Sequence, residues 1–106
     1  MKKKTQVAKR KPTKTLEPVI KDIFENSKVR VVEATWKPGS ESTGMELPAR
    51  VTRGLKGGTL TRIYADGKKE KVKFKSGEVK YGDPTPMAII KNTSKNTIVL
   101  YSVFLK

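Results

Sequence analysis

From residue 58 onward, apolar and polar side chains alternate in short runs that are separated by turn residues. Thr59–Tyr64 and Glu70–Lys75 form two such runs, and Asp66-Gly67 lies between them. Alternation of this kind places one set of side chains on each face of a strand. An Asp-Gly pair between two runs accommodates the positive φ angles of a type I′ turn. The pattern therefore predicts a β-hairpin over residues 59–75.

Similar runs before and after this hairpin extend the β pattern. They cover Lys28–Lys37, Val79–Tyr81, Met87–Lys91 and Thr97–Leu105. Residues 19–24 fit either a short strand or a helical turn. Short strands about every eight to twelve residues, separated by Gly and Pro turns, are typical of an all-β sandwich or barrel. No stretch of useful length has the period of a helix.

The last run is apolar on both faces. It carries Ile98, Leu100 and Phe104 on one face, and Val99, Tyr101, Val103 and Leu105 on the other. A strand that is apolar on both faces is usually buried on both. We expect one face to line a barrel interior and the other to pack against a covering segment or a second subunit, with a homodimer favoured.

The length of 106 residues is that of one domain, and the positive charge is concentrated at its start. Residues 1–16 hold seven Lys and Arg and no Asp or Glu, which is half of the net charge of +14. We expect a flexible basic tail over 1–16 and one folded domain over 17–106. Because the tail has no aromatic residue on which bases could stack, a solvated arm is favoured over an arm that binds nucleic acid phosphates by counterion release.

The chain contains no His and no Cys. This composition excludes His-based catalytic triads, thiolate nucleophiles, zinc fingers, thiolate-bound iron–sulfur clusters and His-ligated haem. The sequence also lacks the apolar core of a signal peptide and the roughly 20 apolar residues of a membrane span. We therefore expect a cytoplasmic protein that has no membrane partner.

Three segments together resemble the small single-domain cupins (cupin-2-like), which are compact RmlC-like barrels. They are KVRVVEATWKPG at residues 28–39, LKGGTLTRIYADGKKEKVKFKSGEV at 55–79 and MAIIKNTSKNTIVLYSVFLK at 87–106. The resemblance covers about three quarters of the chain. It implies an all-β fold, namely a cupin-like double-stranded β-helix (jelly-roll) barrel that follows the basic N-terminal arm.

The same resemblance implies a metal site, because three His and one Glu bind a metal inside the barrel of that family. At the four ligand positions this chain has Met45, Leu47, Val51 and Ala88. A thioether is a weak, soft ligand, and the other three side chains ligate nothing. We therefore expect no metal and no cofactor, and a site in which these residues form either a filled core or the walls of an apolar pocket.

Two arginines are candidates for binding a carboxylate or a phosphate in such a pocket. Arg53 follows Val51 by two residues, so strand alternation predicts that it faces the same interior. A cation inside a barrel needs an acidic partner or an anionic ligand. Arg62 is the second candidate, and Trp36 and Tyr64 are expected to form the floor of the pocket.

Lys71, Lys73 and Lys75 form a basic stripe on one face of the predicted hairpin. The stripe fits contacts with phosphate groups. It also fits the protection of an edge strand against aggregation, which is the interpretation that we favour.

Together these features favour a metal-free, non-catalytic protein that binds a small molecule in the barrel or has a structural role. The first alternative is a nucleic-acid-associated basic protein that uses its tail. The second is a metal-independent isomerase or lyase, in which a Glu, a Lys or a Tyr such as Tyr81 or Tyr101 would be the base. No residue of the sequence is singled out as catalytic.

Overall fold

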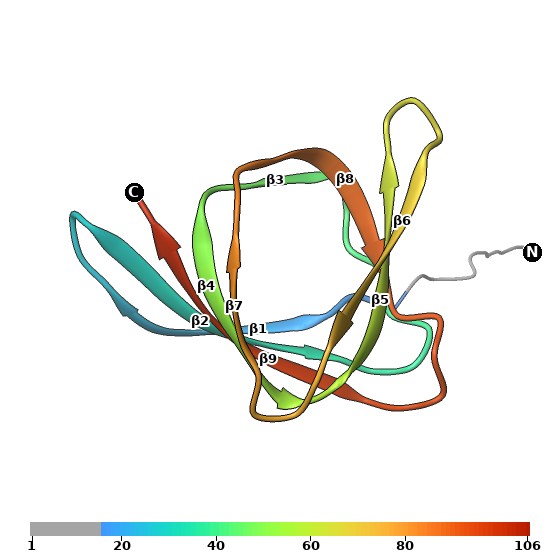
Figure 1. Ribbon diagram of the computed structural model, residues 1–106, viewed down its shortest axis with the longest axis horizontal. Coiled ribbons are helices and arrows are strands. Elements are labelled where there is room, and N and C mark those ends of the chain that lie inside the picture. Colours follow the sequence, from blue (N-terminus) through green and yellow to red (C-terminus); the bar gives the residue numbers. More distant parts are fainter. Residues whose placement is uncertain (1–15) are drawn as a thin grey trace, which may run out of the picture.

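The computed structural model describes residues 16–106. In that part of the chain all regular secondary structure is β-strand, and turns and loops connect the strands (Figure 1). The strands are β1 (Val19–Glu25), β2 (Val29–Trp36), β3 (Met45–Leu47), β4 (Arg50–Lys56), β5 (Gly58–Tyr64), β6 (Lys69–Phe74), β7 (Val79–Gly82), β8 (Thr85–Lys91) and β9 (Ile98–Leu105). The prediction of an all-β fold is confirmed. Residues 19–24 form a strand and not a helical turn.

The nine strands form two antiparallel sheets that enclose a barrel (Figure 1). The first sheet has the order β1-β2-β9-β4-β7, and the second has the order β3-β8-β5-β6. From β2 to β9 the chain changes sheet at every connection except the hairpin between β5 and β6. This winding is that of a double-stranded β-helix, a form of the jelly roll. The described part of the chain contains no helix that is long and apolar enough to cross a membrane.

The hydrophobic core joins strands of both sheets. Its buried members are Trp36, Leu60, Ile90, Ile98 and Leu100. Ile98 is completely buried. Full burial of a side chain of this size contributes about 1.5–3 kcal/mol to the stability of the fold. The packing of this cluster therefore helps to hold the two sheets together.

A buried amide fixes the connection between β8 and β9. Asn92 is 1% exposed, and its Nδ2 donates to the carbonyl oxygens of Trp36 and Asn96, both at 2.8 Å. Its Oδ1 accepts a hydrogen bond from the backbone N–H of Ser94 at 3.0 Å. The side chain therefore satisfies loop groups that would otherwise be unpaired beside the core.

The predicted hairpin is present as β5 and β6, with a different loop from the expected one. The backbone N–H of Gly67 donates to the carbonyl of Tyr64, and that of Tyr64 donates to the carbonyl of Lys68. Gly67 has a φ of +88°. The loop thus has three residues and ends in a left-handed glycine, instead of the two residues of a type I′ turn.

Candidate functional site

The inner faces of the two sheets line a cavity of about 990 Å³ that opens to solvent. One part of its wall is apolar and belongs to the core or packs against it: Trp36, Leu60, Phe74, Ile90 and Leu100. A small barrel is either filled by side chains or left with room for a small ligand. This barrel has the room.

Charged side chains line another part of the cavity, and positive charge dominates among them. The basic residues are Arg30, Arg50, Arg62, Lys71, Lys73, Lys80 and Lys106, and the acidic ones are Glu46, Glu70 and Asp83. A concave surface with one dominant sign of charge concentrates small ions of the opposite sign. The cavity therefore favours anions.

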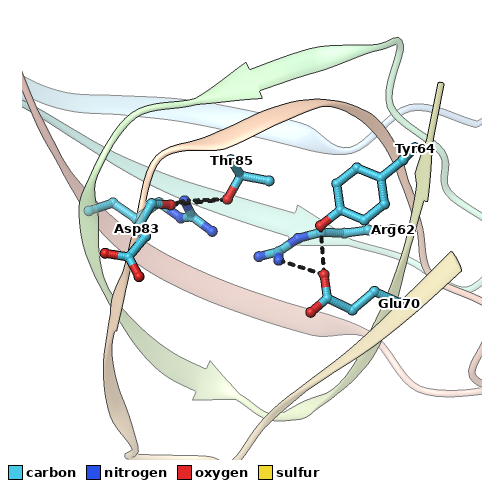
Figure 2. Close-up of polar contacts among 6 residues, drawn as sticks. Arg62, Tyr64, Glu70, Asp83 and Thr85 are labelled. Atoms are coloured by element: carbon cyan, nitrogen blue, oxygen red, sulfur yellow. Dashed lines mark hydrogen bonds and ion pairs between the residues drawn. The ribbon is translucent and has the colours of Figure 1, made fainter. Parts of the chain in front are cut away.

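One wall of the site is built by the hairpin of β5 and β6. Arg62 and Tyr64 share a face of β5, and Glu70 is the register partner of Arg62 on β6. Tyr64 Oη donates to Glu70 Oε1 at 2.6 Å, and Arg62 Nη1 donates to the same oxygen at 3.4 Å (Figure 2). The hydrogen bond from Tyr64, with a further contribution from Arg62, lowers the pKa of the Glu70 carboxyl.

The opposite wall holds Arg50, at the start of β4. This residue is 7% exposed, and its Nη1 donates to Asp83 O at 2.8 Å, Thr85 Oγ1 at 3.1 Å and Pro48 O at 3.3 Å. All three acceptors are neutral. Within residues 16–106, no carboxylate forms an ion pair with Arg50. Burial, and then the positive charge of Arg62, lower the pKa of the Arg50 guanidinium.

The two walls face each other across the barrel. Figure 2 shows Asp83 and Thr85 on one side, and Arg62, Tyr64 and Glu70 on the other, with the guanidinium of Arg62 pointing across the interior. Because Arg50 is bonded to Asp83 and Thr85, the two arginines approach the same space from opposite strands. Like charges repel in a partly buried site, and an anion between them would interact favourably with both.

Five of the residues predicted for a pocket line this cavity: Trp36, Met45, Leu47, Arg62 and Tyr64. Ala88 is buried and pairs with Met45 on β3 and Tyr64 on β5, but it does not belong to the lining.

Val51 and Arg53 do not face the cavity, so the prediction of an inward orientation is wrong for both. They lie exposed on the outer face of β4, whereas Arg50 and Thr52 point inward. Residues 48–49 carry the chain from one sheet to the other and interrupt the alternation by one residue. Arg50 therefore has the inward position that was expected of Arg53.

The basic stripe lies on β6, which is an edge strand. Lys71 and Lys73 border the mouth of the cavity, and Lys75 follows the end of the strand; all three are exposed. The Nζ of Lys80 donates to the carbonyl of Lys73. The role of the stripe, in contacts with phosphate groups or in the protection of an edge strand, stays a prediction. The basic tail lies almost entirely outside the described residues, because these begin at Leu16.

Arg50, Glu70 and Thr85 belong to the site and were not predicted from the sequence. Glu70 carried a partial signal, because the predicted hairpin places it across from β5. The predicted two-residue turn would put it opposite Ile63, and only the three-residue loop of the structure puts it opposite Arg62. Arg50 gave no such signal, since its orientation depends on the connection between two sheets. Of the two tyrosines considered for catalysis, Tyr101 lies on the outer face of β9 and does not line the cavity, whereas Tyr81 borders the cavity and is largely exposed.

Solved structures with similar folds identify the class of this barrel. A cupin domain from Bordetella pertussis Tohama I has a TM-score of 0.79 at 18% identity, covering 90% of this chain and 99% of that one. An RmlC-like cupin family protein from Methanocaldococcus jannaschii has a TM-score of 0.62 at 16% identity, and the match covers 91% of this chain and 84% of that one. An oxalate oxidase in complex with the substrate analogue glycolate has a TM-score of 0.60 at 12% identity, and the match covers 87% of this chain and 52% of that one. No protein-family model and no curated protein sequence matches the chain. The chain has the cupin fold, as the resemblance of its sequence predicted.

The residues of this barrel do not fit the metal that the cupin fold implies. Met45 and Ala88 are paired across β3 and β8, Leu47 packs against the core, and Val51 points away from the interior. None of these side chains offers an oxygen or nitrogen ligand. Within residues 16–106, no three Asp and Glu side chains lie close enough together to hold a cation.

Proposed function

We propose that this cupin-fold protein is a non-catalytic, metal-free binding protein for a small organic anion, whose charged group lies between Arg50 and Arg62. The observation that carries the proposal is the pair of arginines that approach each other across the cavity, one of which has no carboxylate partner among residues 16–106. A carboxylate is the simplest group that accepts hydrogen bonds from two guanidinium groups at once.

The arginines are held in position before a ligand arrives. Arg50 is fixed through Nη1 by three acceptors, and the side chain of Arg62 is only 14% exposed. Because the two side chains are already ordered, binding costs little additional side-chain entropy. The partly buried location also strengthens the attraction to an anion relative to a surface site.

The apolar wall of the cavity determines which uncharged body the ligand can have. Trp36, Leu60 and Phe74 line the same cavity as the arginines. A pocket that combines an apolar wall with a few polar groups orients a ligand through the polar groups and gains affinity from the apolar surface. We therefore expect a carboxylic acid with an aromatic or aliphatic body in preference to a polyanion.

Isothermal titration calorimetry with benzoate and benzamide on the untagged, complete chain tests the proposal. The two probes share a ring and differ in charge, so a preference of at least about tenfold for benzoate is expected from a charge-assisted contact. Equal affinities, or no binding of benzoate, would contradict the proposal. Native mass spectrometry of the freshly purified protein is the complementary measurement, and a stoichiometric metal ion would overturn the metal-free assignment.

The matched variants are Arg62→Gln and Arg53→Gln. Both remove one positive charge from a strand of the barrel, but only Arg62 lines the cavity. Arg62→Gln should weaken benzoate binding by about one order of magnitude or more, because it removes a charged donor. Arg53→Gln should leave binding unchanged. Equal effects of the two substitutions would show that net charge, and not the site, controls binding.

A further inference from the structure

The basic stripe runs along the free edge of the four-stranded sheet, on its outer face. Lys71 and Lys73 are the register partners of Thr61 and Thr59 on β5, which do not line the cavity. Lys69, at the start of β6, extends the stripe to a row of four exposed lysines. Alternate residues of a strand lie about 6.6–6.8 Å apart, so the row is about 20 Å long. The hairpin loop at the end of the row projects from the barrel (Figure 1).

Within residues 16–106, no acidic side chain forms an ion pair with a lysine of this row. The segment 56–80 contains eight Lys and Arg and three Asp and Glu. Of the three acids, Glu70 is paired with Arg62, which lines the cavity. The carboxylate oxygens of Asp66 and Glu78 accept backbone N–H groups of neighbouring residues. An exposed row of charges of one sign produces a local potential that attracts polyanions.

The basic segment at the start of the sequence joins the fold at this same sheet. The carbonyl of Leu16, the first described residue, accepts the backbone N–H of Glu41 at 2.7 Å. Glu41 forms a β-bridge with Lys91 on β8, and Lys91 is the register partner of Thr61. Thr61 in turn pairs with Lys71 of the stripe. The segment 1–16, with its seven Lys and Arg, therefore enters the described fold at the sheet that carries the stripe.

We propose that this face binds the phosphate backbone of a nucleic acid duplex, without regard to base sequence. A lysine acts as a point charge toward phosphate, and a row of lysines releases the counterions that a duplex condenses. Direct reading of base edges in the major groove commonly uses Arg, Asn or Gln. On β5, β6 and β8, Arg62 is the one residue of these three types, and it lines the cavity. The interaction does not depend on the ligand of the cavity.

The uncharged residues of the sheet favour a duplex over a single strand or a membrane surface. Proteins that bind single strands stack bases on exposed aromatic rings. In residues 16–106 the exposed aromatic residues are Phe24 and Tyr81, and both lie on the five-stranded sheet. Stable binding to a lipid surface combines basic charge with apolar groups that insert into the bilayer. Among the exposed large apolar residues of the described chain, only Met87 lies on a strand of the four-stranded sheet.

Fluorescence anisotropy of a labelled DNA duplex of about 20 base pairs tests the proposal, with the complete chain titrated at several KCl concentrations. We expect a Kd of about 1–100 μM near physiological salt, equal for two duplexes of unrelated sequence. The logarithm of the association constant should fall linearly with the logarithm of the salt concentration, by about 0.9 for each phosphate contacted. A chain that does not bind the duplex at about 100 μM protein and about 50 mM KCl would overturn the proposal.

Removing the stripe isolates its contribution. The stripe variant carries the three substitutions Lys71→Gln, Lys73→Gln and Lys75→Gln. It should bind at least about tenfold more weakly, with a salt dependence shallower by about two to three, because up to three phosphate contacts are lost. The matched control removes the same charge at exposed positions on or beside β1 and β2, through Lys21→Gln, Lys28→Gln and Lys37→Gln. The control should bind within about twofold of the wild type, and equal losses in the two variants would overturn the proposal, because net charge would then control binding.

A measurement on the wild type accompanies the variants, because loss of charge from an edge strand also promotes aggregation. Backbone amide NMR spectra with and without the duplex should show the largest shifts in β6 and little change in β1 and β2. The opposite distribution would overturn the assignment to this face.

Two further probes identify the partner. A DNA single strand of the same length should bind more weakly than the duplex, because the face has no exposed aromatic ring among the described residues. Vesicles of phosphatidylserine and phosphatidylcholine in equal amounts should also bind more weakly at the same salt concentration. Stronger binding of the single strand would overturn the assignment to a duplex, and stronger binding of the vesicles would assign the face to a lipid surface instead.

Discussion

Arg50 and Gly82 are register partners on β4 and β7, and a Cβ atom at Gly82 would lie 2.7 Å from the Cζ of Arg50. The position of the guanidinium therefore depends on the absence of a side chain on the neighbouring strand. Three hydrogen bonds through Nη1 then hold it there. A substitution at Gly82 can therefore move the guanidinium of Arg50 while Arg50 itself stays unchanged.

Gly82→Ala should weaken benzoate binding while the barrel remains folded. The new methyl group would also approach Nε and Nη2 of Arg50, at 2.9 and 3.0 Å, so the guanidinium has to move. A displaced guanidinium makes a poorer charge-assisted contact with the ligand, so a loss of about one order of magnitude in affinity is expected. Calorimetric titration measures the change. Gly44→Ala is the control, because its methyl would meet only the flexible Met87 side chain at 3.3 Å. Unchanged affinity in Gly82→Ala would argue against a role for Arg50.

Glu70→Gln should strengthen the binding of an anion. In the wild type, the Glu70 carboxylate is paired with Arg62, and therefore competes with a ligand for the same donor. Removing its charge while keeping its size should raise the affinity for benzoate by about three- to tenfold, given the modest energy of an ion pair whose carboxylate is half exposed. Glu41→Gln is the control, since it removes a comparable ion pair with Lys91 elsewhere in the chain. Weaker binding in Glu70→Gln would indicate that Glu70 positions Arg62 and does not compete with the ligand.

The sequence predicted the strands well because their order depends on local patterns. Alternation in β5, β6 and β9, together with turn residues between them, was sufficient to place these elements within one or two residues. Which face of a strand points inward was equally predictable within the hairpin, as in the case of Arg62 on β5. It was not predictable for β4, because residues 48–49 connect two sheets and the phase of the alternation is set by the tertiary packing of both.

Only part of the candidate site could be predicted from the sequence, because the rest depends on the tertiary packing of the two sheets. Arg62, Tyr64 and Trp36 could be assigned from strand alternation alone. Two of the three partners of Arg50, by contrast, come from positions more than 30 residues away in sequence, at Asp83 and Thr85. Contacts of this range follow from the winding of the barrel, and no local pattern encodes them.

The interaction between Tyr64 and Glu70 should produce a small pH dependence of stability. The pKa of Glu70 in the folded protein lies below its ordinary value of 4.5, first because of the hydrogen bond from Tyr64. The contact therefore stabilises the protein at any pH above the ordinary value, and this stabilisation is lost as the pH falls through the lower, folded-state pKa. Because the carboxylate is half exposed, we expect the effect to be below about 1 kcal/mol.

Tyr64→Phe measures this contribution directly. The substitution removes the hydroxyl that donates to Glu70 Oε1 and keeps the ring, so the pKa of Glu70 should rise toward its ordinary value. Carboxyl carbon NMR titration of the two proteins reports that shift. Thermal unfolding between about pH 6 and 3 should show a smaller loss of stability in the variant than in the wild type. A pKa of Glu70 that does not move would assign its lowering to Arg62 instead.

Thr52 and Ser102 form a buried hydroxyl pair between β4 and β9, with 2.9 Å between Thr52 Oγ1 and Ser102 Oγ. Removing either hydroxyl leaves the other without a partner, so Thr52→Val and Ser102→Ala should each cost about 1–2 kcal/mol in the free energy of unfolding. The double variant removes both polar groups together, and should cost clearly less than the two single variants combined. Urea unfolding of the four proteins gives the coupling energy. Strictly additive costs would mean that water from the cavity replaces the missing partner, and that the inner face of β4 is wet at Thr52.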